Sequence, residues 1–143
     1  MNRETIYSAV FALVSSVPGL VLKSRTLKHW SDVSYVDQPC LFQTQTKENA
    51  IQNIKMPTRW TLHIDLYLYA HTRGDTTISP SSILNPLVDA INVLFTPHPA
   101  AGEQTLDGLV EKCRIEGTIE TDEGLLGEQG VVIIPIVVYL GST

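Results

Sequence analysis

The sequence of 143 residues has only two cysteines, Cys40 and Cys113, and neither has a partner at metal-ligand spacing. This argues against a disulfide framework or a cysteine-based zinc site as the basis of the fold. We predict two small buried thiols in a reducing compartment. A single domain of this length buries roughly two-thirds of the surface that its unfolded chain exposes, so the core needs no covalent cross-link.

Positive charge is also scarce. The chain has 10 Lys and Arg residues against 15 Asp and Glu residues, which gives a net charge of −5. A domain that grips phosphates normally displays an excess of cations, so the charge argues against a reader of nucleic acid and leaves only passive contact with DNA open. The one concentrated basic segment contains Lys23, Arg25 and Lys28, and we interpret it as a solvated strand edge.

Features of secreted and membrane proteins are missing too. The apolar N-terminal run carries Glu4 where a signal peptide carries positive charge, and no small-residue cleavage pattern follows Leu13 and Val14. Hydrophobic residues make up 43% of the chain and charged residues 17%, which is ordinary for a globular protein. We therefore expect a chain that acts in the cytoplasm and has no membrane partner.

Motifs that carry chemistry are absent or incomplete. The glycine-rich residues 124–130 lack the Lys-Ser/Thr ending of a phosphate loop, and no Gly-x-Ser-x-Gly elbow is present. His63, Asp65 and His71 fall on one face of a predicted strand, an arrangement more typical of cross-strand hydrogen bonds than of a metal site. We expect no catalytic residue, cofactor or metal. We interpret four further residues as a solvated acidic rim: Glu116, Glu120, Asp122 and Glu123.

The longest run with one period is residues 59–71, RWTLHIDLYLYAH. Every second residue from Trp60 to Ala70 is apolar, which is the two-residue repeat of a β-strand. Pro57 precedes the run and biases Met56 towards an extended conformation, so the strand has a defined beginning. We predict a long central strand whose apolar face the rest of the chain covers.

Two segments have the spacing of amphipathic helices. In residues 2–16 the apolar positions include Ile6, Val10 and Val14, with Asn2 as the predicted N-cap. A second helix follows Ser79, and we expect its regular part to begin near Asn85 because Pro86 interrupts the pattern. We predict that both apolar stripes pack on the central strand.

The remaining segments predict further strands. Residues 40–45 have clear boundaries and should pair with the central strand, while residues 20–22 and 27–30 are typical of short strands. Residues 110–121 alternate, 122–124 give a turn signal, and 131–140 are apolar on both faces, with Pro135 at an edge or a bulge. This order predicts one α+β domain, with two helices packed on a largely antiparallel β-sheet.

The connection in residues 46–56 is unusually long for two adjacent strands. Its polar character predicts a hairpin tip that serves assembly, and a merely tolerated insertion is the alternative. The over-apolar last strand also favours a neighbour over a substrate. The candidate interaction residues are Lys47, Glu48, Asn49, Ile51, Gln52, Asn53, Ile54, Lys55, Val131, Val132 and Ile133.

Four parts of the chain resemble small tail-completion proteins of tailed bacteriophages and prophages. They are RETIYSAVFALV, LKHWSDV with QPCLF, PTRWTL with DLYLYAH, and IEGTIETDEGLLGEQGVVIIPI. The resemblance spans nearly the whole chain, and within that group the chain looks most like the lambda-like tail terminator, or tail tube terminator, family. It implies a small α+β sandwich that works as a ring, usually hexameric, at the head-proximal end of the tail tube.

The resemblance also implies a role. Such a ring caps the tube, ends its polymerisation and offers its other face to a neck or head-completion protein, while DNA passes through the lumen without specific binding. The protein would be a virion component that assembles in the host cytoplasm. Two alternatives stay open: a head–tail connector or stopper of the neck, and a small cytoplasmic hydrolase in which His63 and Asp65 converge with other polar groups.

Overall fold

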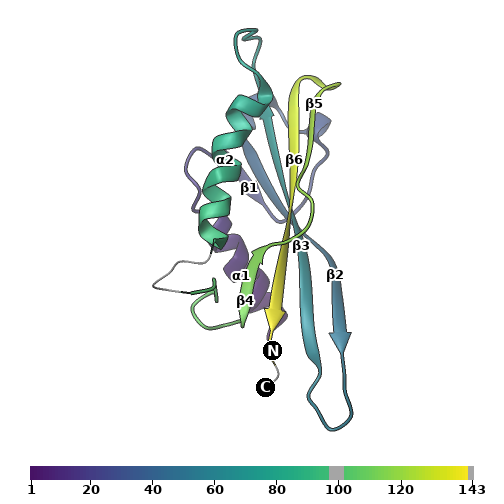
Figure 1. Cartoon of the computed structure of the whole chain (residues 1–143). Coiled ribbons are helices and arrows are strands. Elements are labelled where there is room, and N and C mark those ends of the chain that lie inside the picture. Colours follow the sequence, from purple (N-terminus) through teal and green to yellow (C-terminus); the bar gives the residue numbers. More distant parts are fainter. Residues whose placement is uncertain (97–101, 142–143) are drawn as a thin grey trace.

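Strand β3 (Arg59–His71) lies at the centre of the sheet, with the bounds that the alternation of the sequence predicts. The computed structural model describes residues 1–96 and 102–141. In this part of the chain the strand order is β1-β2-β3-β6-β4, and β5 pairs with another part of β6 (Figure 1). The other strands are β1 (Leu22–Ser24), β2 (Cys40–Ile51), β4 (Lys112–Ile115), β5 (Glu120–Gly124) and β6 (Gly127–Leu140).

Two helices, α1 (Arg3–Val14) and α2 (Pro80–Phe95), cover one face of this sheet, which we call the inner face. The β1–β2 pair is parallel and the other described pairs are antiparallel. The predicted α+β domain with two helices on a largely antiparallel sheet is therefore confirmed. The predicted packing is confirmed as well, since one cluster contains residues of both helices and of β3: Ile6, Val10, Val14, Leu87, Ile91, Leu62, Ile64, Leu66 and Leu68.

The beginning of α2 differs from the prediction. The helix starts at Pro80, and Pro86 lies inside it. Two contacts stabilise this start: the Ser79 side chain caps the backbone N–H of Ser82, and a Glu123 carboxylate oxygen of β5 accepts from the N–H of Ser81 at 2.7 Å. An anion at a helix N-terminus is favourable, and together these contacts offset the hydrogen bond that Pro86 removes.

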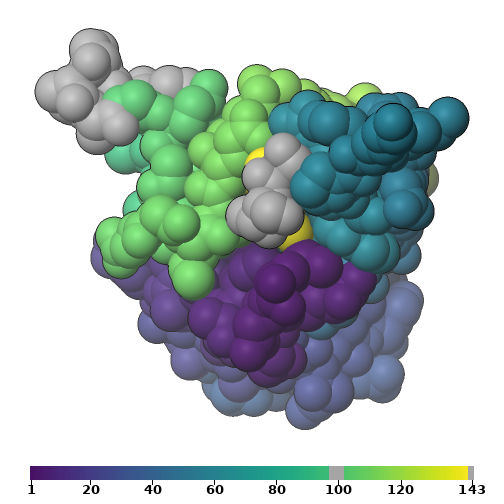
Figure 2. Space-filling model, turned by 90° about the horizontal axis from the view of Figure 1, so that it is seen from below, coloured from purple at the N-terminus to yellow at the C-terminus, as the bar shows by residue number. Residues whose placement is uncertain are grey.

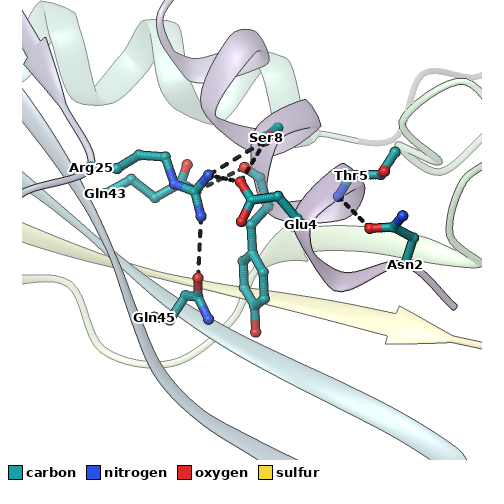
Figure 3. Close-up of polar contacts among 8 residues, drawn as sticks. Asn2, Glu4, Thr5, Ser8, Arg25, Gln43 and Gln45 are labelled. Carbon is teal, nitrogen blue, oxygen red and sulfur yellow. Dashed lines mark hydrogen bonds and ion pairs between the residues drawn. The ribbon is translucent and has the colours of Figure 1, made fainter.

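The opposite face of the sheet, the outer face, is covered by residues 20–39, which we call the strap. The strap contains β1 and two short 3-10 helices, η1 (Trp30–Asp32) and η2 (Tyr35–Asp37), instead of the strand predicted at residues 27–30. Arg25 joins the strap to α1 and β2 through Glu4, Ser8 and Gln45 (Figure 3). Of the three cations predicted to be solvated, Arg25 is therefore in an ion pair, which lowers the pKa of Glu4.

The region predicted as one strand over residues 110–121 is two strands, β4 and β5, separated by Gly117 at φ +120°. Residues 122–124, predicted as a turn, all belong to β5, and the turn lies at Leu125 and Leu126. Strand β6 lies inside the sheet, yet Pro135 falls opposite the gap between β4 and β5. The predicted edge position is thus correct for Pro135 and wrong for the strand as a whole.

Candidate assembly surfaces

The β2–β3 hairpin extends beyond the rest of the sheet at one end of the molecule (Figure 1). Its strands pair as far as Ile51 and Arg59, and the turn closes with a hydrogen bond from the Met56 N–H to the Asn53 carbonyl at 3.1 Å. We call residues 46–59 the hairpin end. Seen from this end, its side chains stand beside the purple N-terminal helix (Figure 2).

The long loop predicted for residues 46–56 is corrected by this pairing. Residues 46–51 belong to β2, and only residues 52–58 connect it to β3. Among the predicted interaction residues, Lys47, Glu48, Asn49 and Ile51 are therefore strand residues. Gln52, Asn53, Ile54 and Lys55 lie in the connection, where each is exposed.

Glu48 has an internal role that the sequence did not reveal. Its carboxylate accepts hydrogen bonds from Arg3 at 2.9 Å and from the Tyr7 hydroxyl at 2.9 Å, so it ties α1 to the hairpin. Burial, followed by the hydrogen bond to Glu48, raises the pKa of Tyr7 above its usual range. Because Glu48 serves this contact, the surface that remains for a partner consists of its neighbours.

Apolar side chains and cations dominate the tip. Ile54 is 91% exposed, and Ile51 and Met56 are exposed as well. The cations of the hairpin end are Lys47, Lys55 and Arg59, of which Arg59 lies 3.5 Å from Glu111. Since Glu48 is the one carboxylate in residues 46–59 and is paired with Arg3, the end carries a net positive charge in a chain of net charge −5.

Lys55 occupies a backbone conformation that favours glycine or asparagine. Its φ of 64° is in the left-handed region, at the third position of the turn 53–56. A non-glycine residue there is uncommon and costs conformational energy. A glycine would adopt this conformation at lower cost, but it would carry no charge at the tip.

A second surface lies on the outer face, at the opposite end of the sheet. A groove of about 600 Å³ separates the strap from β5 and β6. Its lining is mostly apolar and aromatic, with two carboxylates from β5. We call it the outer groove, and its lining residues are Leu27, His29, Trp30, Tyr67, Tyr69, Glu120, Thr121, Asp122, Leu126, Val131 and Ile133.

The three predicted interaction residues of β6 divide between the two faces of the sheet. Val131 and Ile133 line the outer groove, where Ile133 is half-buried. Val132 is 2% exposed and lies in the core beneath the helices, so it is not accessible to a partner. The two-residue period of a strand places consecutive residues on opposite faces, which is why the three residues cannot act together.

Four hydrogen bonds hold the strap in place beside the groove. The Tyr69 hydroxyl donates to the Lys28 carbonyl at 2.7 Å, and Arg73 donates to the Gln38 carbonyl at 2.8 Å. The side-chain amides of Gln38 and Gln129 are buried and bond to each other reciprocally, at 3.0 and 2.8 Å. These bonds fix the groove wall in the monomer.

The acidic side of the groove continues towards the middle of the outer face. Burial and the negative charge of Glu120 raise the pKa of Asp65. Glu120 and Asp122 have no ion-pair partner in residues 1–96 and 102–141. The groove therefore presents uncompensated negative charge next to an apolar floor.

The histidines on the polar face of β3 lie beside polar side chains of the neighbouring strands. His63 Nε2 lies 3.1 Å from the Asn49 side chain on β2, which confirms a cross-strand hydrogen bond for this residue. Burial and Lys47 lower the pKa of His63. His71 lies 4.0 Å from Glu128. Within the described ranges, no three His, Cys, Asp or Glu side chains gather as a metal site requires.

Both cysteines are free and buried, as predicted. Burial is the main cause that raises the pKa of each thiol, Cys40 and Cys113, to about 12. They lie on opposite faces: Cys40 contacts Phe42 and Tyr69 beneath the strap, while Cys113 belongs to the core beneath the helices.

No model of a known protein family matches the chain, and no curated protein matches it. Among the helices of the described residues, none has the length and apolar character needed to cross a membrane.

The outer groove was missed at the sequence level, although a signal was present. Tyr67 and Tyr69 lie on the polar face of the central strand, opposite the core residues with which they alternate in sequence. Two aromatic residues two positions apart on that face indicate a second buried or binding surface. The contributions of Trp30, Glu120 and Leu126 come from segments distant in the sequence, which no local pattern joins.

Proposed function

We propose that the protein is a structural component of a phage tail, a tail terminator that forms a ring at the head-proximal end of the tail tube. The ring ends polymerisation of the tube protein and offers its other face to a neck or head-completion protein. DNA passes through the lumen without specific binding. The resemblance of the quoted segments to tail terminator proteins supports this particular role.

The structural observation that carries the proposal is the exposed hairpin end. A monomer gains nothing from a projecting hairpin whose tip exposes Ile51, Ile54 and Met56 to water. Strand β3 pairs with β6 only as far as Trp60, so the connection at residues 52–58 has no further strand beside it, and contact with neighbouring subunits would stabilise this end. An assembling ring protein supplies such contacts, and a small soluble enzyme does not need them.

Electron microscopy of the purified protein, alone and mixed with tail tubes, tests the proposal. We expect closed rings that bind one end of each tube and prevent the addition of further tube protein. A matched sample of tubes without the protein should continue to elongate. Rings found only on the portal side of heads would instead indicate a connector or stopper of the neck, and protein that never associates with tubes or heads would contradict both.

A further inference from the structure

The hairpin end and the outer groove are complementary in character. The hairpin end exposes Ile54 and Met56 and carries cations, and the groove offers an apolar floor with Glu120 and Asp122 at its side. Opposite charges that flank matching apolar surfaces are the usual arrangement of a specific contact between proteins. We propose that the hairpin end of one copy docks in the outer groove of a second copy, which forms the junction between subunits.

A molecule cannot fill its own groove. Along β3, Arg59 at the hairpin end is eight residues from Tyr67 in the groove, a separation of about 27 Å at the rise of a strand. The turn at residues 53–56 extends further away still, and the two regions lie at opposite ends of the sheet (Figure 1). Only the hairpin end of a second copy can therefore reach this groove.

This geometry defines the type of junction. The hairpin end and the groove are different surfaces, so the contact is heterologous and each copy uses both surfaces at once. Such contacts form a ring when the rotation between copies closes. The inference rests on the proposed function in that both need the chain to self-assemble, and it adds the two surfaces that meet.

The unusual backbone at Lys55 fits the same contact. A glycine at φ 64° would remove the conformational cost, but it would also remove the cation at the outermost point of the hairpin. In the junction this ammonium group lies against the carboxylates of Glu120 and Asp122. The charge pair orients the tip while Ile54 and Met56 bury their side chains against the groove floor.

Two charge reversals test the junction by size-exclusion chromatography with light scattering and by native mass spectrometry. Lys55→Glu and Glu120→Lys, made separately, should each raise the concentration at which assembly is half complete at least tenfold. The chain that carries both reversals should regain much of the lost assembly. Lys23→Glu, a reversal at an exposed residue of β1 that does not line the groove, is the matched control and should assemble as the wild type does.

A mixing experiment shows whether the junction is heterologous. Ile54→Asp disables the tip, and Glu120→Lys with Asp122→Lys disables the groove. Each variant should be monomeric alone, and an equimolar mixture should give a one-to-one dimer, since one intact tip meets one intact groove. Leu125→Asp, which places the same charge on a side chain that is 93% exposed outside the groove, should still assemble. Thermal melts should show that every variant is folded.

The outcomes separate this inference from the proposed function. Reversal variants that assemble normally, or a wild-type chain that stays monomeric at every concentration, would overturn the inference. Rings that depend on Lys55 and Glu120 but never bind tail tubes would support the junction and contradict the terminator role. Rings that cap tubes and tolerate both reversals would support the role and contradict the junction.

Discussion

The two faces of the sheet are built differently. On the inner face, both helices bury one continuous core that includes Leu66 of β3 and Ile134 of β6. On the outer face, a strap with only short 3-10 helices covers one end, and the buried cluster contains Val33, Cys40, Phe42, Tyr69 and Val131. The rest of the outer face carries the groove and the polar residues of the hairpin.

The two faces contribute differently to folding and to contact with other molecules. Burial of apolar surface on the inner face supplies most of the free energy of folding. The outer face keeps apolar area partly accessible in the groove, where burial against another molecule can still lower the free energy. The fold is thus stabilised mainly by one face, and the other face keeps apolar surface accessible to another molecule.

The largest expected effect is on the inner face. Leu66→Ala removes a side chain that is fully buried beneath the helices, so the free energy of unfolding should fall by about 2–5 kcal/mol. Denaturant unfolding of the monomer measures the change. Ile133→Ala on the outer face is the matched comparison and should cost less than about 1.5 kcal/mol, because Ile133 is only half-buried. Equal losses would contradict the asymmetry between the faces.

An intermediate effect is expected where the strap meets the sheet. Gln129→Ala leaves the buried Gln38 amide without its main partner, which should cost about 1–3 kcal/mol in denaturant unfolding. Replacing both residues by leucine removes donor and acceptor together and should cost less than the single change. A double variant that is less stable than Gln129→Ala would show that the amide pair does not act as a unit.

The sequence was sufficient to predict an element where its apolar repeat corresponds to a buried face. The period of β3 and the apolar stripes of α1 and α2 could be predicted because one side of each contacts the core. Residues 46–51 could not be predicted as strand, since residues 46–49 are polar at every position and show no two-residue apolar repeat. The outer groove depends on Trp30, Tyr67 and Leu126, which come together only through the tertiary fold.

The smallest expected effect is a difference between the labelling rates of the two thiols, Cys40 and Cys113. Because burial raises the pKa of both to about 12, each should resist a thiol reagent at pH 8 until the structure opens. We expect Cys40 to react faster than Cys113, since lifting the strap exposes Cys40 without disturbing the helices. Mass spectrometry of peptides after timed labelling measures both rates. Faster labelling of Cys113 would indicate that the inner face opens first.

Pro135 has a consequence for solubility. On the β3 side, β6 pairs without interruption from Gln129 to Leu140, but on its other side β4 ends opposite Ile136 and β5 begins opposite Ile133. Since proline has no N–H to donate at that point, one long strand cannot pair along this side of β6. The sheet border there consists of two pieces of four and five residues. Short borders are poor templates for the strands of foreign chains, so this side resists the indiscriminate sheet growth that leads to aggregates.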